Sequence, residues 1–134
     1  MTAPHPRGLL DTSVLIADET GRPLDEASLP DEAFVSVITM AELQAGILAA
    51  ADTTTRARRL ATLAALGGLD PLPVDAAAAT HWAPLRVRLA EEGRRAKIND
   101  LWIAAVAADG MPVVTHDDDF DPIEAIGGPP VVRA

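Results

Sequence analysis

The chain has no cysteine and no tyrosine, and only two tryptophans and two phenylalanines occur among its 134 residues. The lack of cysteine excludes disulfides, thiolate zinc sites and cysteine nucleophiles. The scarcity of aromatic side chains disfavours nucleic-acid binding through a platform of stacked bases. No apolar run reaches the roughly 18 residues that span a bilayer, and no basic and apolar leader pattern is visible. We therefore expect a cytoplasmic protein without membrane contact.

Positive charge is also scarce, because 11 Lys and Arg stand against 20 Asp and Glu, for a net charge of −9. Such a balance works against binding to phosphates, which depends largely on Lys and Arg. The distribution is uneven, however: eight of the basic residues lie in residues 51–98 and leave that segment at +3. This predicts one side that faces anions and another that binds cations, although solvation of helix faces is the ordinary alternative.

Length and apolar content suit one ordinary domain over residues 1–134. An apolar fraction of 49% supplies a single buried core. Residues 1–6 carry no pattern and are expected to form a flexible N-terminal segment.

Short apolar runs alternate with segments of helical periodicity. Strands are expected over 7–11, 33–38 and 112–115 and at an edge over 131–132. Because 69–74 contains two prolines, any strand there should be short or at an edge. Helices are expected from residue 12, from residue 39, over 53–66, over 75–92, over 98–108 as a buried helix, and from a capping box at 121–124. Pro84 is expected to kink its helix or to start a new one. The alternation predicts a three-layer α/β/α domain with a mostly parallel sheet.

Four acidic positions stand out in this pattern. Asp11 and Asp117 follow apolar strands, Asp100 opens an apolar helix, and Glu42 follows Thr39 at the spacing of a capping box. Each alone has an ordinary explanation as a cap, a partner of the helix dipole or a turn residue. Ligands of open α/β sheets, however, bind beyond the carboxyl ends of the strands, where Asp11 and Asp117 fall.

Taken together, these acids are expected close to the core. Buried carboxylates are costly unless they are paired, and no Lys or Arg directly flanks Asp11, Glu42 or Asp117. Neighbouring carboxylates also raise one another's pKa, whereas Mg²⁺ or Mn²⁺ prefers oxygen ligands and would keep them ionised. The pattern therefore predicts a site for a divalent cation.

Four segments in a fixed order carry a family resemblance. They are GLLDTSVLI at 8–16, SVITMAEL at 36–43, INDLWIAA at 98–105 and VTHDDDF at 114–120. The chain resembles the PIN-domain family and is especially similar to the VapC toxins of bacterial toxin–antitoxin pairs. The resemblance implies a PIN-like fold and a Mg²⁺-dependent endoribonuclease that a VapB-like antitoxin holds inactive. It also implies a homodimer, or a heterotetramer with the antitoxin.

The resemblance further implies roles for single residues. Asp11 and Asp100 match the metal-binding aspartates, and Glu42 matches the acid on the helix after the second strand. Asp117 is the preferred fourth acid and Asp119 the alternative. Glu42 or Asp117 would orient the attacking water. The polar residues expected around the metal ligands are Ser13, Asn99 and Thr115, and His116 is interpreted as a bystander.

Basic residues just before Asp100 are then expected to hold the RNA backbone over the metal site. They are Arg86, Arg88, Arg94, Arg95 and Lys97. Because aromatic side chains are few, recognition by shape and backbone contacts is favoured, as for a folded RNA such as tRNA.

Three other readings of the acidic positions compete. In a phosphatase-like hydrolase, Asp11 would be the nucleophile, but Ser13 stands where a second acid is usual. A signal-receiver domain needs a buried lysine near the last strands, and Lys97 is the one lysine. A non-catalytic PIN-like module that binds RNA or protein is disfavoured because all four acidic positions are filled.

Overall fold

The computed structural model describes residues 6–134; residues 1–5, most of the segment expected to be flexible, lie outside the described residues. A parallel sheet with the strand order β2-β1-β3-β4 forms the centre of the fold. Its strands are β1 Arg7–Leu10, β2 Glu32–Phe34, β3 Val113–Thr115 and β4 Val131–Arg133. The expected edge strand at the C-terminal end is thus present, and it pairs with β3.

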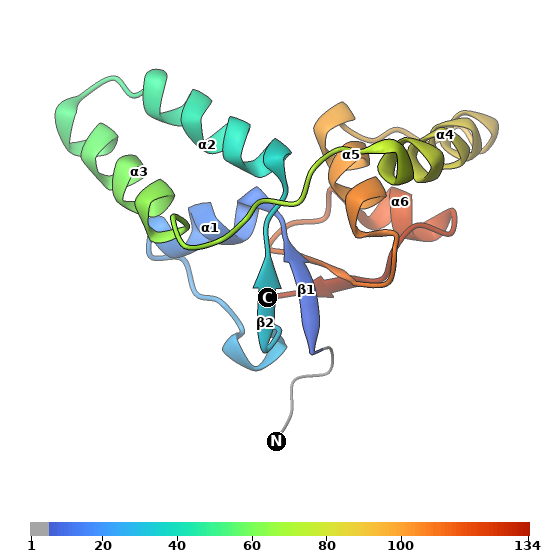
Figure 1. Cartoon of the computed structure of the whole chain (residues 1–134), viewed down its shortest axis with the longest axis horizontal. Helices are drawn as coiled ribbons and strands as arrows, with labels where there is room; N and C mark the ends of the chain where they lie inside the picture. The colour runs from blue at the N-terminus through green and yellow to red at the C-terminus, as the bar shows by residue number, and fades with distance from the viewer. Residues whose placement is uncertain (1–5) are drawn as a thin grey trace.

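Six α-helices and a short 3-10 helix connect these strands in residues 6–134. They are α1 Thr12–Glu19, η1 Glu26–Ser28, α2 Val37–Leu48, α3 Thr53–Ala65, α4 Ala76–Glu91, α5 Ile98–Ala107 and α6 Asp121–Ala125. Helices α1–α3 lie to one side of the strands and α4–α6 to the other (Figure 1). None of the helices in the described part of the chain is long and apolar enough to cross a bilayer.

Neighbouring residues of β1 face different helical layers. Leu9 is fully buried in a cluster that includes Leu85 of α4 and Ile103 of α5. Leu10 packs instead against a second cluster that contains Leu43 of α2. Because successive side chains of a strand point to opposite faces, helices cover both faces of the sheet. The predicted α/β fold with a parallel sheet between helical layers is confirmed.

Helix α2 begins two residues earlier than the expected start at Thr39. The strand expected over 33–38 ends at Phe34, and Ser36 caps the helix by accepting a hydrogen bond from the backbone N of Thr39 at 3.2 Å. The expected capping box between Thr39 and Glu42 is therefore wrong. The β-branched residues at 35–38 suggested a strand, but the Ser36 cap places the last two of them in the helix.

Helix α4 continues through Pro84 and does not divide there. Proline cannot donate to the carbonyl of Thr80, but both residues are exposed, so this carbonyl is not a buried acceptor without a donor. On the opposite side of the helix, Leu85 and Leu89 are each 4% exposed. Burial of these side chains outweighs the cost of the proline.

Two further expectations are wrong in detail. Phe120, not Asp121, is the N-cap of α6, and Glu124 accepts a hydrogen bond from the backbone N of Val131 at 2.6 Å instead of closing a capping box. Helix α5 is not buried all round, since Ile98 is 71% exposed. Residues 69–74 contribute a single bridge, between Ser36 and Leu72, in agreement with the expectation that any strand there is short.

Candidate active site

Asp11 stands where β1 ends and α1 begins. It is the N-cap of α1, and its Oδ2 accepts hydrogen bonds from the backbone N of Ser13 at 3.3 Å and from Thr115 Oγ1 at 3.2 Å. Burial raises the pKa of Asp11, the hydrogen bonds from Ser13 oppose that rise, and the charge of Asp117 adds to it. The carboxylate is thus held firmly in position although its charged form is disfavoured.

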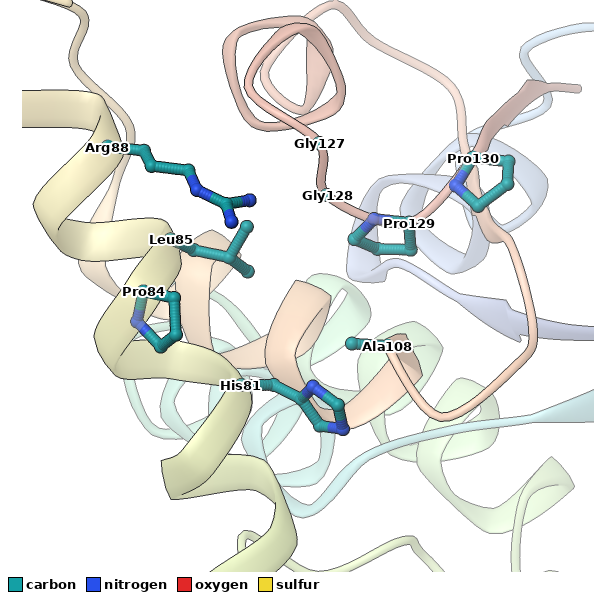
Figure 2. A pocket seen from close by; sticks show the side chains of 9 residues that line it. All are labelled: His81, Pro84, Leu85, Arg88, Ala108, Gly127, Gly128, Pro129 and Pro130. Carbon is teal, nitrogen blue, oxygen red and sulfur yellow. The ribbon is translucent and has the colours of Figure 1, made fainter.

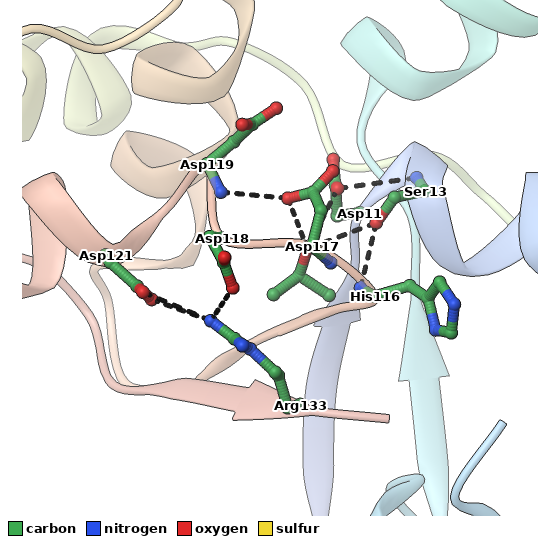
Figure 3. A network of polar contacts seen from close by, with 9 residues as sticks. Asp11, Ser13, His116, Asp117, Asp118, Asp119, Asp121 and Arg133 are labelled. Atoms are coloured by element: carbon green, nitrogen blue, oxygen red, sulfur yellow. Dashed lines mark hydrogen bonds and ion pairs between the residues drawn. The ribbon is translucent and has the colours of Figure 1, made fainter.

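Two hydroxyls connect Asp11 to Asp117 (Figure 3). Thr115 Oγ1, at the end of β3, lies 3.2 Å from Asp117 Oδ1 and 3.1 Å from Ser13 Oγ. Ser13 Oγ in turn accepts a hydrogen bond from the backbone N of His116 at 2.9 Å. Since the threonine hydroxyl has one hydrogen, it can donate to only one of the two carboxylates at a time. The pair of acids therefore has fewer donors than it needs.

Glu42 approaches from α2 and is fixed by α1. Thr12 Oγ1 donates to Glu42 Oε1 at 2.7 Å and lies 3.1 Å from Thr39 Oγ1. Thr12 and Thr39 are buried, while Glu42 is half-buried. The two threonines thus direct one oxygen of Glu42 toward the start of α1.

Asp100 lies in the first turn of α5 and is only 7% exposed. Its Oδ2 is buried and has no hydrogen-bond partner among residues 6–134. Burial, followed by the charges of Asp11 and Asp119, raises the pKa of Asp100 to about 7. The charge of Glu42 adds to the rise and that of Lys97 opposes it. The fold therefore gathers acids from the end of β1, from α2, from α5 and from the turn after β3 within electrostatic reach of each other.

The turn after β3 separates its three aspartates. Asp117 bonds to Thr115 and accepts a hydrogen bond from the backbone N of Asp119 at 3.0 Å. Asp118 points away from Asp11 and pairs with Arg133 (Figure 3). Asp119 Oδ2 lies 2.8 Å from Lys97 Nζ, and this contact raises the pKa of the lysine.

The remaining candidates lie apart from the acids. Asn99 is exposed, and its side chain forms no hydrogen bond with the described residues. The ring of His116 points away from Asp117, and its Nδ1 lies 2.8 Å from the carbonyl oxygen of Ala134 (Figure 3). His81 pairs with Asp109 at 2.8 Å.

The five basic residues expected to bind RNA do not face one place. Arg86, Arg94 and Arg95 line one hollow. Arg88 points from α4 across a second hollow toward Gly127 and Gly128, and its Nη1 donates to the carbonyl of Ile126 at 3.4 Å (Figure 2). Lys97 contacts Asp119, as described above. The five basic residues of 86–97 thus lie at three different places in the structure.

The acids do not form a closed metal cage. Among residues 6–134, no three Asp, Glu or His side chains lie close enough to hold one ion between them. Mg²⁺ does not require such a cage, because it keeps several waters and is commonly held by one or two carboxylates. The unpartnered Oδ2 of Asp100 and the all-oxygen donor set fit this kind of site.

Comparisons with known proteins bear on this arrangement. The model of the PIN domain family matches residues 8–125. The chain is 55% identical to Ribonuclease VapC5 of Mycobacterium tuberculosis, over 94% of each chain. It is 40% identical to Ribonuclease VapC4 of the same organism, over 85% of this chain and 88% of the relative. The crystal structure of VapBC-5, a member of the VapBC family of toxin–antitoxin systems from M. tuberculosis, has 52% identity, with 96% and 99% coverage and a TM-score of 0.86.

Proposed function

The chain belongs to the PIN domain family, and on this premise we propose that it is a VapC-type endoribonuclease that uses Mg²⁺, or Mn²⁺ in its place. Its relatives are ribonucleases of toxin–antitoxin pairs, so it is an RNase toxin that an antitoxin neutralises. The identity of the metal and the residues that hold it are proposed from the geometry of the acids.

The observation that carries the proposal is the buried, unpartnered Oδ2 of Asp100 among other carboxylates. A buried charge without a partner destabilises a fold, and here the neighbouring Asp11, Asp119 and Glu42 increase the penalty. Such a conflict with folding is expected at functional sites. A divalent cation would remove it by supplying the positive charge that the fold lacks.

PIN domain ribonucleases are generally dependent on a divalent metal. Asp11 and Asp100 would hold the ion, while Glu42 and Asp117 complete the negative charge around it. A divalent cation held there would supply Lewis-acid chemistry, which polarises a phosphate and makes a water more acidic.

The residues around this position have separate tasks. Thr12 holds one oxygen of Glu42, which leaves the other oxygen to orient the attacking water and accept its proton. Thr115 and Ser13 keep Asp11 and Asp117 side by side. Asp119 is the weaker candidate for a ligand, because the ammonium group of Lys97 already contacts it. The proposed mechanism assigns no proton transfer to a histidine.

Both hydrophobic clusters pack on one sheet, which supports the proposal that the chain works as a single domain. A folded RNA such as tRNA as the substrate, a homodimer or a heterotetramer with the antitoxin, and a cytoplasmic location remain predictions.

Cleavage of purified total RNA tests the proposal directly. We expect cleavage with Mg²⁺ and none with EDTA. Loss of a residue that only supports a metal ligand commonly costs 10- to 100-fold, so Asp11→Asn and Asp100→Asn, which remove ligands, should each reduce the rate by at least about 100-fold. The same two variants should lose the rise in melting temperature that Mg²⁺ gives the parent protein.

Asp118→Asn is the matched control. Asp118 lies in the same acidic turn but pairs with Arg133 at the surface, so this variant should cleave RNA at the parent rate. Cleavage that persists in EDTA, or that is unchanged in both ligand variants, would show that the proposed mechanism is wrong.

A further inference from the structure

A hollow of about 590 Å³ lies between α4, the connection to α5 and the start of α5. Trp82 and Arg86 line it from α4, Arg94 and Arg95 from the connection, and Ile98 from α5. Residues 82 and 86 lie one helical turn apart on the same face of α4. Pockets of this volume hold ligands of nucleotide size.

Charge in this hollow has one sign. None of the described residues that line it is acidic, and Arg86 and Arg95 form no ion pair with any residue of 6–134. Arg94 has one contact, to Glu92 at 3.6 Å, and both side chains are about half exposed, so it contributes little. Three guanidinium groups are therefore available for an anionic ligand, and guanidinium matches the geometry of phosphate.

An aromatic side chain is held beside these arginines. The rings of Trp82 and Trp102 stack with centroids 4.9 Å apart and an interplanar angle of 16°. Stacking on Trp102 fixes the orientation of the Trp82 indole in the wall of the hollow. Base stacking on such a ring tolerates different bases, because every base has a π-face.

The hollow leads to the acids through Arg95. A neighbouring hollow of about 390 Å³, different from the one that Arg88 crosses, shares Arg95 and Ala96 with the hollow beside Trp82 and extends to Lys97 and Asp119. The backbone N of Asp119 donates to Asp117 Oδ1 at 3.0 Å, so this hollow of about 390 Å³ borders the proposed metal site. A polynucleotide whose scissile phosphate lies on the acids would thus pass Arg95 as it enters the larger hollow.

We propose that the hollow lined by Trp82, Arg86, Arg94 and Arg95 is a subsite for a nucleotide close to the scissile bond. The arginines bind its phosphate, and its base packs against Trp82. The proposal rests on the ribonuclease function above and adds where the substrate chain runs. A second copy of this protein fits less well, because a symmetric interface centred here would oppose three arginines to three arginines.

Binding can be measured apart from cleavage in the Asp11→Asn protein with EDTA, using a short fluorescein-labelled single-stranded RNA. Arg86→Gln combined with Arg95→Gln should raise Kd about tenfold. For single strands each lost phosphate contact makes the slope of log K against log salt shallower by about 0.7, and the arginines share one phosphate, so the slope should become shallower by about 0.7 at most. Arg88→Gln is the control. Arg88 lies on the same helix but points into the hollow beside Gly127 and Gly128, so this variant should change neither Kd nor the salt slope.

Trp82→Leu tests the aromatic contact. It should raise Kd at least fivefold with no change in the salt slope, since stacking releases no counterions. Trp102→Leu breaks the same ring pair but keeps the Trp82 indole among the lining residues, so its affinity should fall clearly less than that of Trp82→Leu. Equal loss in both tryptophan variants would mean a structural effect and would overturn the base contact.

Two other outcomes overturn the subsite as a whole. Unchanged binding by the double arginine variant, in a protein that cleaves RNA with Mg²⁺, would remove the subsite and leave the proposed function standing. A shift of oligomeric state in that variant, measured by light scattering, would make the hollow an interface between copies. Absence of both binding and cleavage in the parent protein would instead refute the ribonuclease function itself.

Discussion

The end of β1 and the start of α5 present two aspartates that are buried almost equally and supported very differently. Asp11 is 4% exposed and Asp100 is 7% exposed. Asp11 accepts hydrogen bonds from Ser13 and Thr115, whereas Oδ2 of Asp100 has no partner within residues 6–134. Burial raises the pKa of both groups, and that of Asp100 reaches about 7. The number of hydrogen-bond donors, and not burial alone, therefore decides how much a buried carboxylate would be stabilised by a cation.

Among the substitutions that test this comparison, Asp100→Asn should change the free energy of unfolding most. In the unfolded chain Asp100 ionises near 3.8, and in the folded protein only near 7. Below about pH 4 both states hold the proton and ionisation costs nothing. Between about pH 4 and 7 the unfolded chain loses its proton first, so the stability of the metal-free protein falls as pH rises and then levels off.

The full shift corresponds to about 4 kcal/mol at most, and relaxation with water entry reduces this to about 2–3 kcal/mol. Urea unfolding in EDTA near pH 8 should therefore find Asp100→Asn more stable than the parent by about that amount, and less so near pH 5. Asp11→Asn should gain less, because Asp11 already has donors and Asn caps a helix equally well. A parent protein as stable as Asp100→Asn near pH 8 would contradict the comparison.

Much of the fold could be predicted from local pattern. Apolar runs that alternate with helical segments are sufficient to predict the parallel sheet, because strands that are connected by helices pair in parallel and are buried under those helices. The boundaries that were missed depend on contacts that pattern does not show. Ser36 takes the cap that Thr39 was expected to supply, and α4 continues through Pro84 because its other side packs on α5.

For the site, the predicted acids Asp11, Asp100 and Glu42 could be named from strand ends and helix starts. Their assignment to the metal remains a prediction. Sequence reasoning missed the contact between Lys97 and Asp119, because 22 residues separate them and no local signal connects them. It also missed Trp82, because this side chain comes to line a hollow with Arg94 and Arg95 only when α4 packs beside the 93–97 connection.

Thr115→Val should have the next largest effect, because it makes Asp11 resemble Asp100. Valine suits the buried position in β3 but removes the hydroxyl that serves Asp11 and Asp117. Loss of this donor should cost about 1–2 kcal/mol near pH 8 and raise the pKa of Asp11 further. The cost should shrink near pH 5, where Asp11 is more often protonated.

Urea unfolding at both pH values measures this change. Thr80→Val serves as the control, since Thr80 is exposed on α4 and its hydroxyl donates to the carbonyl of Ala76 and to no carboxylate of residues 6–134. An equal loss of stability for Thr115→Val at both pH values would mean that the hydroxyl acts through packing and not through the carboxylates.

Lys97→Met should have the smallest effect, and of the two compared aspartates it acts on Asp100. The charge of Lys97 lowers the pKa of Asp100, so its removal should move the titration of Asp100 above about 7. The Lys97 side chain is 73% exposed, and solvent screens its charge, so the shift should be a fraction of a pH unit and should disappear in high salt. The ¹³C carboxyl resonance of Asp100, followed against pH in EDTA, reports it directly. Arg95→Met is the control, because the charge of Arg95 is not among the largest causes of the Asp100 shift. A downward shift in Lys97→Met would mean that Lys97 acts mainly by holding Asp119 close to Asp100, and the contrast with Asp11 would then depend on neighbouring acids more than on missing donors.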